Sequence, residues 1–172
     1  EDAGYDIYTC ETDTIVIEPC STRLIDTGIA IACHKSYFPK FFDKGGMGSQ
    51  GIIVGAGVGD SGYRNGYFVP LVNTNKDKWL IITNQDEKDI KQSHVFDLFE
   101  NKFISNVSLS GLSFINNRYV NKQNCIIKPL NKAITQFVML PVPTFETKEL
   151  TWEELKSIES ERGLGCLGSS GK

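Results

Sequence analysis

Short apolar runs separated by turn residues dominate the chain from Tyr5 to Asn73. The runs are rich in β-branched and aromatic residues and lie at residues 5–8, 14–17, 23–25, 29–31, 51–54 and 67–69. Residues 18–21 and 43–46 contain proline, glycine, serine and aspartate, which favour turns. Several short strands at this spacing predict an all-β protein, either a sandwich or a barrel.

Residues 76–129 have a different composition, rich in Asn, Lys and Ser with scattered aromatic residues, and we interpret them as an insertion into the β domain. Within them, residues 86–101 have the spacing of a short amphipathic helix, and residues 103–114 alternate as a strand does. A strand over residues 133–140 then continues the main pattern and ends at Pro141.

The end of the chain predicts a helix followed by a glycine-rich tail. Thr151 and Glu154 have the spacing of a capping box, which favours a helix over residues 152–161, with an extended stretch as the alternative. Residues 162–172 combine glycines and serines with Arg162 and Lys172. This composition suits a phosphate, because glycine lets backbone N–H groups turn toward an anion and arginine offers a planar fork. Taken alone, such a tail is better explained by fraying.

Length and charge limit the classes of protein that the chain can represent. With 172 residues, 40% of them apolar and 23% charged, it suffices for one domain with a full core. The net charge of -3 gives no electrostatic footprint for a nucleic-acid polymer, so a phosphate-bearing ligand should be small. No apolar run approaches the roughly 20 residues of a membrane span. The chain starts at Glu1 rather than Met, so we expect residues to precede it.

The cysteines and histidines favour neither a disulfide framework nor a zinc site. The five cysteines form no C-x-x-C pair and are odd in number. His34 and His94 are far apart in the sequence, without the spacing of metal ligands. A reducing compartment is expected, which is the cytoplasm, or the host cytoplasm or nucleus if the chain is viral. The high Asn, Lys and Ile content is typical of an AT-rich genome, such as that of a phage or virus.

Four further segments place polar side chains at turns and strand positions. They are A-G-Y-D-I with Asp6, D-K-G-G with Lys44, G-A-G-V-G-D-S-G-Y-R with Asp60 and Tyr63, and A-I-T-Q-F with Gln136. With the tail, and in this order, they resemble the five motifs of the trimeric deoxyuridine triphosphate nucleotidohydrolases (dUTPases). Those motifs read roughly A-G-x-D-L, R-S-G/S, G-V-I-D-x-x-Y-R-G, R-I-A-Q and R-G-x-G-G-F-G-S-T-G. The predicted insertion resembles in position that of some staphylococcal phage dUTPases.

The resemblance, which covers residues 1–74 and 130–172, implies a fold and a reaction. The fold would be a dUTPase-like β-sandwich or jelly-roll-type barrel (β-clip) over residues 1–172, and the reaction hydrolysis of dUTP to dUMP and diphosphate. Asp60 would be the general base, because a carboxylate within reach of a water can take its proton as the new P–O bond forms. Tyr63 would lie under the deoxyribose and exclude a 2′-hydroxyl. Backbone groups around Gly57 and Phe68 would recognise uracil.

The family also implies a magnesium ion on the three phosphates of the substrate. Asp6 and Gln136 would contact the water shell of this Mg²⁺, which suits a cation that keeps its waters. Lys44 and Gly45 would bind the substrate. Without the other motifs, Asp6 as a turn cap and Gln136 as a satisfied strand amide would be the simpler readings.

The tail, residues 162–172, would be a mobile lid over the substrate. Arg162 would hold the terminal phosphate, Ser169 and Ser170 the phosphate chain, and Leu167 would cover the base. Because the family's tail reaches a site formed by neighbouring subunits, a homotrimer with shared active sites is implied.

The sequence departs from the family pattern at several motif positions. Lys44-Gly45 stands where Arg-Ser is usual, Gly59 where a branched apolar residue is usual, Ala133 where arginine is usual, and Leu167 where an aromatic residue stacks on uracil. The lysine gives a point charge instead of a bidentate fork. These changes predict weaker catalysis than is usual in the family.

Two other functions fit parts of the sequence. One is a regulatory protein on the same scaffold, in which residues 76–129 dock a protein partner and the nucleotide acts as a switch. The other is a deoxycytidine triphosphate deaminase of the same fold, which the spacing of Asp60 and Tyr63 fits poorly. The hydrolase is the preferred interpretation because Asp60, Tyr63, Gln136 and Arg162 are all retained.

Overall fold

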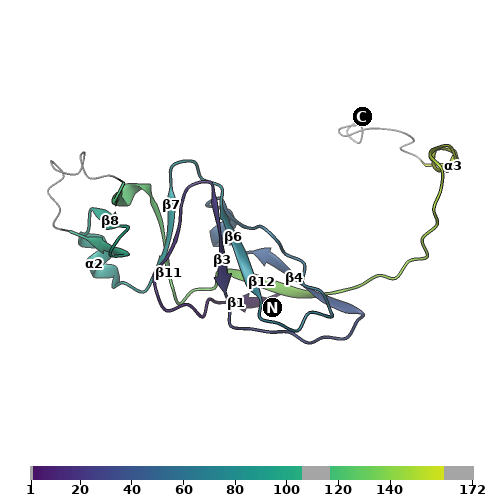
Figure 1. The fold of residues 1–172 in the computed structure, drawn as a ribbon, viewed down its shortest axis with the longest axis horizontal. Coiled ribbons are helices and arrows are strands. Elements are labelled where there is room, and N and C mark those ends of the chain that lie inside the picture. Colours follow the sequence, from purple (N-terminus) through teal and green to yellow (C-terminus); the bar gives the residue numbers. More distant parts are fainter. Residues whose placement is uncertain (1, 106–116, 161–172) are drawn as a thin grey trace. The chain divides into compact units, whose positions relative to one another are not determined.

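The computed structural model describes residues 2–105 and 117–160. The chain divides into two compact units, one ending at Val142 and the other beginning at Pro143, and each is described by itself. The first unit carries the described strands together with helices α1 and α2, and the second carries helix α3 (Figure 1).

The described strands form four sheets of three strands each, which confirms the all-β prediction. Three of the four sheets are antiparallel throughout. Two of these three contain most of the strands predicted for the main pattern. Their orders are β1 (Tyr5–Ile7), β12 (Thr135–Pro141), β4 (Tyr37–Asp43), and β3 (Ser21–Asp26), β6 (Phe68–Asn73), β5 (Ile52–Val54).

The third sheet joins the predicted insertion to the rest of the unit. Its central strand β7 (Trp79–Thr83) pairs antiparallel with β2 (Ile15–Ile17) and parallel with β11 (Cys125–Pro129). Residues 76–129 therefore contribute two strands to a sheet that also contains the N-terminal strand β2. The fourth sheet lies between these two strands in the sequence.

In the fourth sheet, β8 (Val95–Asp97) is central and pairs antiparallel with β9 (Lys102–Ile104) and β10 (Tyr119–Asn121). Helix α2 (Glu87–Gln92) precedes it, and a short 3₁₀ helix, η2 (Lys122–Asn124), leads into β11. Figure 1 shows α2 and β8 at the end of the unit beyond β7 and β11.

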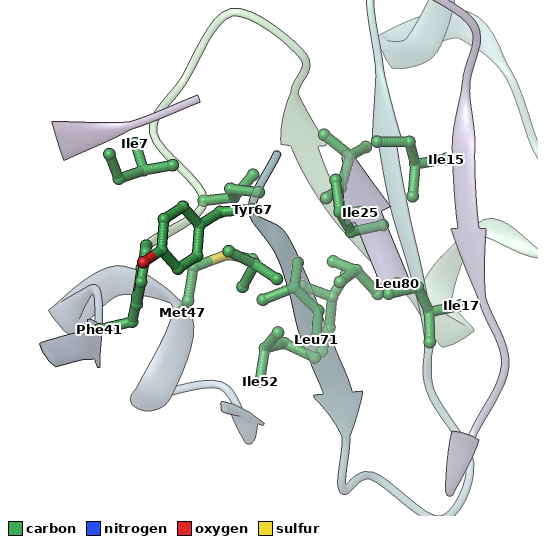
Figure 2. Packing of buried hydrophobic residues seen from close by; sticks show 14 residues of the cluster. Ile7, Ile15, Ile17, Ile25, Phe41, Met47, Ile52, Tyr67, Leu71 and Leu80 are labelled. Carbon is green, nitrogen blue, oxygen red and sulfur yellow. The ribbon is translucent and has the colours of Figure 1, made fainter. Parts of the chain in front are cut away.

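A cluster of buried apolar side chains from the first three sheets forms the main core (Figure 2). The labelled members include Ile15, Ile17, Ile25, Ile52, Leu71 and Leu80, and at one end of the cluster Ile7, Phe41, Met47 and Tyr67. Burial of aliphatic and aromatic side chains contributes about 1.5 to 3 kcal/mol each, so this cluster is the main source of stability.

Strand β7 separates two cores. Leu80 and Ile82 belong to the main cluster, whereas Ile81 faces a second cluster with Phe96, Phe103 and Val120. Leu80, Ile81 and Ile82 are all 0% exposed, so both faces of the strand are buried. A strand of this kind reads as a continuous apolar run and gives no alternating pattern.

The predicted helix over residues 86–101 is wrong in length. Asp86 caps α2 by accepting a hydrogen bond from the Lys88 amide, but the helix ends at Gln92. The Ser93 hydroxyl donates to the Ile90 carbonyl at 2.7 Å, and β8 begins two residues later. All three β8 residues are buried, which is the pattern of a central strand rather than of an amphipathic helix.

Three other local predictions are also corrected. Residues 29–31 form no strand, although the Ile29 carbonyl accepts from the Tyr67 amide. The turn predicted at residues 43–46 continues into the short helix α1 (Gly45–Gly48). Of the strand predicted over residues 103–114, the described part ends at Ile104 in β9.

The described part of the second unit contains helix α3 (Trp152–Ser157). The predicted capping box is confirmed, because the Thr151 hydroxyl accepts from the Glu154 amide at 3.2 Å and the Glu154 carboxylate accepts from the Thr151 amide at 2.7 Å. Hydrogen bonds from the Thr151 amide and the Thr151 hydroxyl to the ionised carboxylate lower the pKa of Glu154. The helix ends at Ser157, four residues before the predicted end.

Candidate active site

The predicted phosphate and metal residues lie together in one pocket. Asp6 of β1 stands directly opposite Gln136 of β12, and Lys44 follows β4, the strand on the other side of β12. The Lys44 ammonium donates to the Asp6 carboxylate at 2.6 Å. The pocket has a volume of about 630 Å³ and is lined by these three residues and residues 2–5.

Hydrogen bonds hold the turn around Lys44 in place. The Asp43 carboxylate accepts from the Val54 amide at 2.6 Å, and the Asp43 carbonyl accepts from the Gln136 side chain at 3.0 Å. The Lys128 ammonium of β11 donates to the Gly46 carbonyl at 2.8 Å. The turn is therefore anchored by β5, β12 and β11, and the contact with Lys128 reaches it from the segment of the predicted insertion.

Glycine is not required by space at position 45. Gly45 is the first residue of α1, and a Cβ atom added there would meet nothing within 4 Å. The missing hydroxyl at this position, where the family usually has serine, is therefore not a consequence of crowding in this chain.

Asp60 and Tyr63 line a second pocket, of about 290 Å³, together with Tyr67 and Phe68. The Tyr63 amide donates to the Asp60 carbonyl at 3.1 Å, which closes the turn that joins them. The Tyr63 ring is 40% exposed, and its hydroxyl donates to the Gly66 carbonyl at 3.1 Å. The Asp60 side chain is exposed, so a ligand in this pocket can reach the carboxylate.

The loop before Asp60 lies against β4. The amides of Phe41 and Gly59 donate to the carbonyls of Gly57 and Pro39, at 2.7 and 2.9 Å. A Cβ atom on Gly57 would stand 2.6 Å from the Phe41 carbonyl oxygen, so this close approach requires glycine. Gly57 itself does not line the pocket, although its neighbours Ala56 and Val58 do.

A series of aromatic rings connects the two pockets within the chain. Tyr5 stacks on Phe137 with 5.2 Å between ring centroids, and Phe137 lies 5.8 Å from Phe41. Phe41 lies 5.2 Å from Tyr67, and the Tyr67 ring meets the edge of Tyr63 at 5.0 Å. The structure thus keeps Asp60 and Tyr63 in a different pocket from Asp6, Lys44 and Gln136. Sequence reasoning missed this series because Tyr5, Phe137 and Phe41 meet only through strand pairing.

The remaining predicted residues, Arg162, Leu167, Ser169 and Ser170, lie outside the described residues, as does the predicted lid over residues 162–172.

The side-chain oxygen atoms of Asp6 and Gln136 in the first pocket fit a magnesium ion that is bound through its coordinated waters. Within the described part of the chain, no group of three or more His, Cys, Asp or Glu side chains could hold a metal ion directly. No hydrogen bond from a described residue engages the second Asp6 carboxylate oxygen or the Gln136 amide oxygen. Two oxygen acceptors on paired strands suit Mg²⁺, which keeps most of its water shell.

Comparison with known proteins gives the same class that the fold and motif positions indicate. The sequence profile of the dUTPase family matches residues 1–86. A deoxyuridine 5′-triphosphate nucleotidohydrolase of Tropheryma whipplei (strain Twist) is 31% identical over 113 residues, which are 64% of this chain and 75% of that protein. A further such enzyme, from Baumannia cicadellinicola, is 35% identical over 86 residues, which are 48% of this chain.

Among solved structures, the Staphylococcus bacteriophage 80alpha dUTPase with dUpNHpp is 28% identical, with a TM-score of 0.64 over 99% of this chain and 87% of that one. The chain therefore belongs to the dUTPase family. It spans 57% of the length of the curated relatives from Baumannia cicadellinicola and Leptospira interrogans. None of the helices in the described part of the chain is long and apolar enough to cross a membrane.

Proposed function

We propose that the protein hydrolyses dUTP to dUMP and diphosphate. The observation that carries the proposal is the pocket shared by Asp60 and Tyr63, in which an exposed carboxylate and a half-exposed ring are fixed three residues apart by one turn. Asp60 takes a proton from a water as the water oxygen bonds to the α-phosphorus. The bond from that phosphorus to the bridging oxygen breaks, and diphosphate leaves. The Tyr63 ring lies under the sugar, where a 2′-hydroxyl has no room.

The uracil base is selected by groups on two sides of this pocket. Phe68 lines the pocket at the start of β6, and the loop around Gly57 stands on the other side, supported by β4. Backbone groups that pair with uracil are an effective filter, because a base that leaves buried partners unpaired can be rejected about 10⁴- to 10⁵-fold, whereas an extra methyl group gives only about 10- to 200-fold.

Phosphate binding belongs to the other pocket. Lys44 exchanges its partly exposed ion pair with Asp6 for the phosphate chain at small cost, since such pairs contribute about 0 to 1 kcal/mol. Asp6 and Gln136 would hold the water shell of Mg²⁺, which would neutralise charge on the phosphates when bound. The family resemblance implies that Arg162, Ser169 and Ser170 would complete the phosphate contacts and that Leu167 would cover the base without stacking.

A homotrimer with shared sites is the assembly that best fits these two pockets. One substrate must contact both the phosphate-binding residues Asp6, Lys44 and Gln136 and the base-side residues Asp60 and Tyr63. Within the chain, however, these two groups of residues line separate pockets. Combining one pocket from each of two neighbouring subunits supplies both groups to one nucleotide. The reaction would limit uracil incorporation into DNA and supply dUMP for thymidylate synthesis.

The test is diphosphate release from dUTP, dCTP, dTTP and UTP with Mg²⁺. We expect preference for dUTP, and a loss of at least about 100-fold in kcat for Asp60→Asn, which keeps the shape but removes the base. The matched control is Asp77→Asn, on an exposed residue that lines neither pocket. Unchanged turnover by Asp60→Asn, or equal use of the four nucleotides, would refute the assignment. Ammonia release from dCTP would support the deaminase instead.

A second candidate is the docking of a protein partner by the segment between β7 and β11. The observation that favours it is the Phe99 ring, 75% exposed, with the Arg118 guanidinium 5.2 Å from its centroid. Arg118 is held by a bidentate contact with the buried Asp97, at 2.7 to 3.1 Å. An aromatic ring beside a fixed arginine is the composition of an interface hot spot.

A variant that lacks the segment between β7 and β11 distinguishes a role in dUTP hydrolysis from a role in partner docking. Because β7 and β11 are parallel, a linker replacing residues 85–124 must return along a five-residue strand, which requires about six extended residues or more. The linker must also carry an apolar side chain that covers Ile81. Retained dUTP hydrolysis in a folded variant would show that the segment is dispensable for chemistry and free to serve binding. Loss of hydrolysis with an intact fold would show that it serves the enzyme itself.

A further inference from the structure

The Tyr67 ring fills the space that a side chain at position 59 would need. A Cβ atom on Gly59 would lie 2.8 Å from the Cε1 and Oη atoms of Tyr67 and 2.8 Å from Pro39 Cγ. Carbon atoms in contact need about 3.5 Å or more, so no side chain fits at position 59 while the Tyr67 ring is in place. The ring therefore fills the space beneath the residue that immediately precedes Asp60.

The Tyr67 ring has little freedom to move. Its backbone amide donates to the Ile29 carbonyl at 2.8 Å, and its carbonyl accepts from the Thr27 hydroxyl at 2.6 Å. The ring is held between Phe41 and Tyr63, and the residue is only 8% exposed. A change in the surroundings of the Tyr67 hydroxyl must therefore come from the loop above it.

The Tyr67 hydroxyl is the single buried side-chain polar atom of the described residues that has no hydrogen-bond partner. Burying a hydroxyl without a partner destabilises a fold, so such groups call for an explanation in each structure. Burial raises the pKa of the Tyr67 phenol, and the nearby Cys33, Tyr63 and Asp60 raise it further. The group is therefore protonated at neutral pH and can donate a hydrogen bond.

We propose that Tyr67 is a further substrate-binding residue, whose hydroxyl donates a hydrogen bond to an oxygen of the deoxynucleotide in the pocket lined by Asp60 and Tyr63. Gly59 covers the hydroxyl in the present conformation. To reach the hydroxyl, the nucleotide must shift the loop at Gly59, which breaks the 2.9 Å hydrogen bond from the Gly59 amide to the Pro39 carbonyl but moves no side chain at position 59. The inference rests on the proposed function, because it adds a ligand contact to the same site.

The experiment compares Tyr67→Phe with the intact chain, using the non-hydrolysable analogue dUpNHpp. The substitution keeps the ring that fills the space at Gly59 and removes only the hydroxyl. We expect the Kd for the analogue, measured calorimetrically with Mg²⁺, to rise about tenfold, the size of one good hydrogen bond. Without ligand, the Tm should rise by about 2 to 4 °C, because an unpaired buried group has been removed.

Tyr8→Phe is the matched control, since Tyr8 is 49% exposed and lines neither pocket, and it should leave both values unchanged. An unchanged Kd for Tyr67→Phe would overturn the proposal, whatever happens to kcat. A lower Tm without ligand would also overturn it, because the hydroxyl would then have a structural partner. If the intact chain itself fails to bind dUpNHpp, the proposed function fails instead, so the two results are distinguishable.

Discussion

Adding one methyl group at Gly57 should destabilise the protein, because the loop before Asp60 lies in contact with the β4 backbone. The new Cβ atom would stand 2.6 Å from the Phe41 carbonyl oxygen and 2.7 Å from the Lys40 ammonium. The lysine side chain can move away, but the carbonyl belongs to a paired strand and cannot. Relief requires the loop and β4 to separate, which stretches the 2.7 Å hydrogen bond from the Phe41 amide to the Gly57 carbonyl.

The expected loss follows from these two effects. Overpacking contributes about 1 to 3 kcal/mol, and the weakened hydrogen bond about 1 kcal/mol, so the free energy of unfolding should fall by about 2 to 4 kcal/mol. For a chain of this size, that lowers the Tm by about 5 to 15 °C. The Gly57 backbone is not in the left-handed region, so the effect comes from space and not from the conformation of alanine.

Gly62→Ala is the matched control in the same loop, because a Cβ atom there meets nothing within 4 Å. It should change the free energy of unfolding by about 0.5 kcal/mol or less. Both variants and the parent should be unfolded in urea at one protein concentration, since the proposed assembly would make stability depend on concentration. A Gly57→Ala variant as stable as the parent, or equal losses for the two variants, would refute the reasoning.

Three further predictions concern the site and the segment between β7 and β11. Gly45→Ser restores the family's hydroxyl at a position where a Cβ atom meets nothing within 4 Å, so kcat for dUTP should increase severalfold without loss of Tm; a decrease in kcat would contradict this. Lys128→Met removes the donor to the Gly46 carbonyl and should raise the KM for dUTP severalfold with a small change in Tm. An unchanged KM would show that the turn around Lys44 keeps its conformation without this hydrogen bond. The Arg118 hydrogen bonds lower the pKa of Asp97, so their contribution to stability is present above the ordinary value of 3.8 and is lost as the pH falls through the lower folded value. Arg118→Gln should therefore have a lower Tm than the parent at pH 7, and the difference in Tm should shrink as the pH falls through this range. A difference in Tm that does not change with pH would contradict the assignment.

Local signals predicted the elements whose structure depends on neighbouring residues. The capping box at Thr151 and Glu154 needs only one turn of chain, and the β-branched runs in β2 and β5 bury alternate residues against the core. The spacing of Asp60 and Tyr63 is equally local, since one turn brings both into the same pocket. For these features, residues that are close together in the sequence determine the local structure.

Other features depend on pairing between distant segments and leave little trace in the sequence. Strand β4 contains Pro39 and Lys40, which disfavour a strand prediction, yet it pairs with β12 along its whole length. β8 resembled part of a helix because the second core that buries it is assembled from residues far apart in the chain. The ring of Tyr67 beneath Gly59 is likewise a tertiary contact, and the unusual glycine in the third motif was its one sign in the sequence.

Strand β7 also determines how the two cores can unfold and how they can change. Because Ile81 is covered by one core while Leu80 and Ile82 are covered by the other, losing the smaller core would expose one face of a strand that supports the larger one. The smaller core should therefore melt together with the main body instead of forming a separate thermal transition. Conversely, we expect that residues 84–124 can change in length and shape, provided that some apolar side chain continues to cover Ile81.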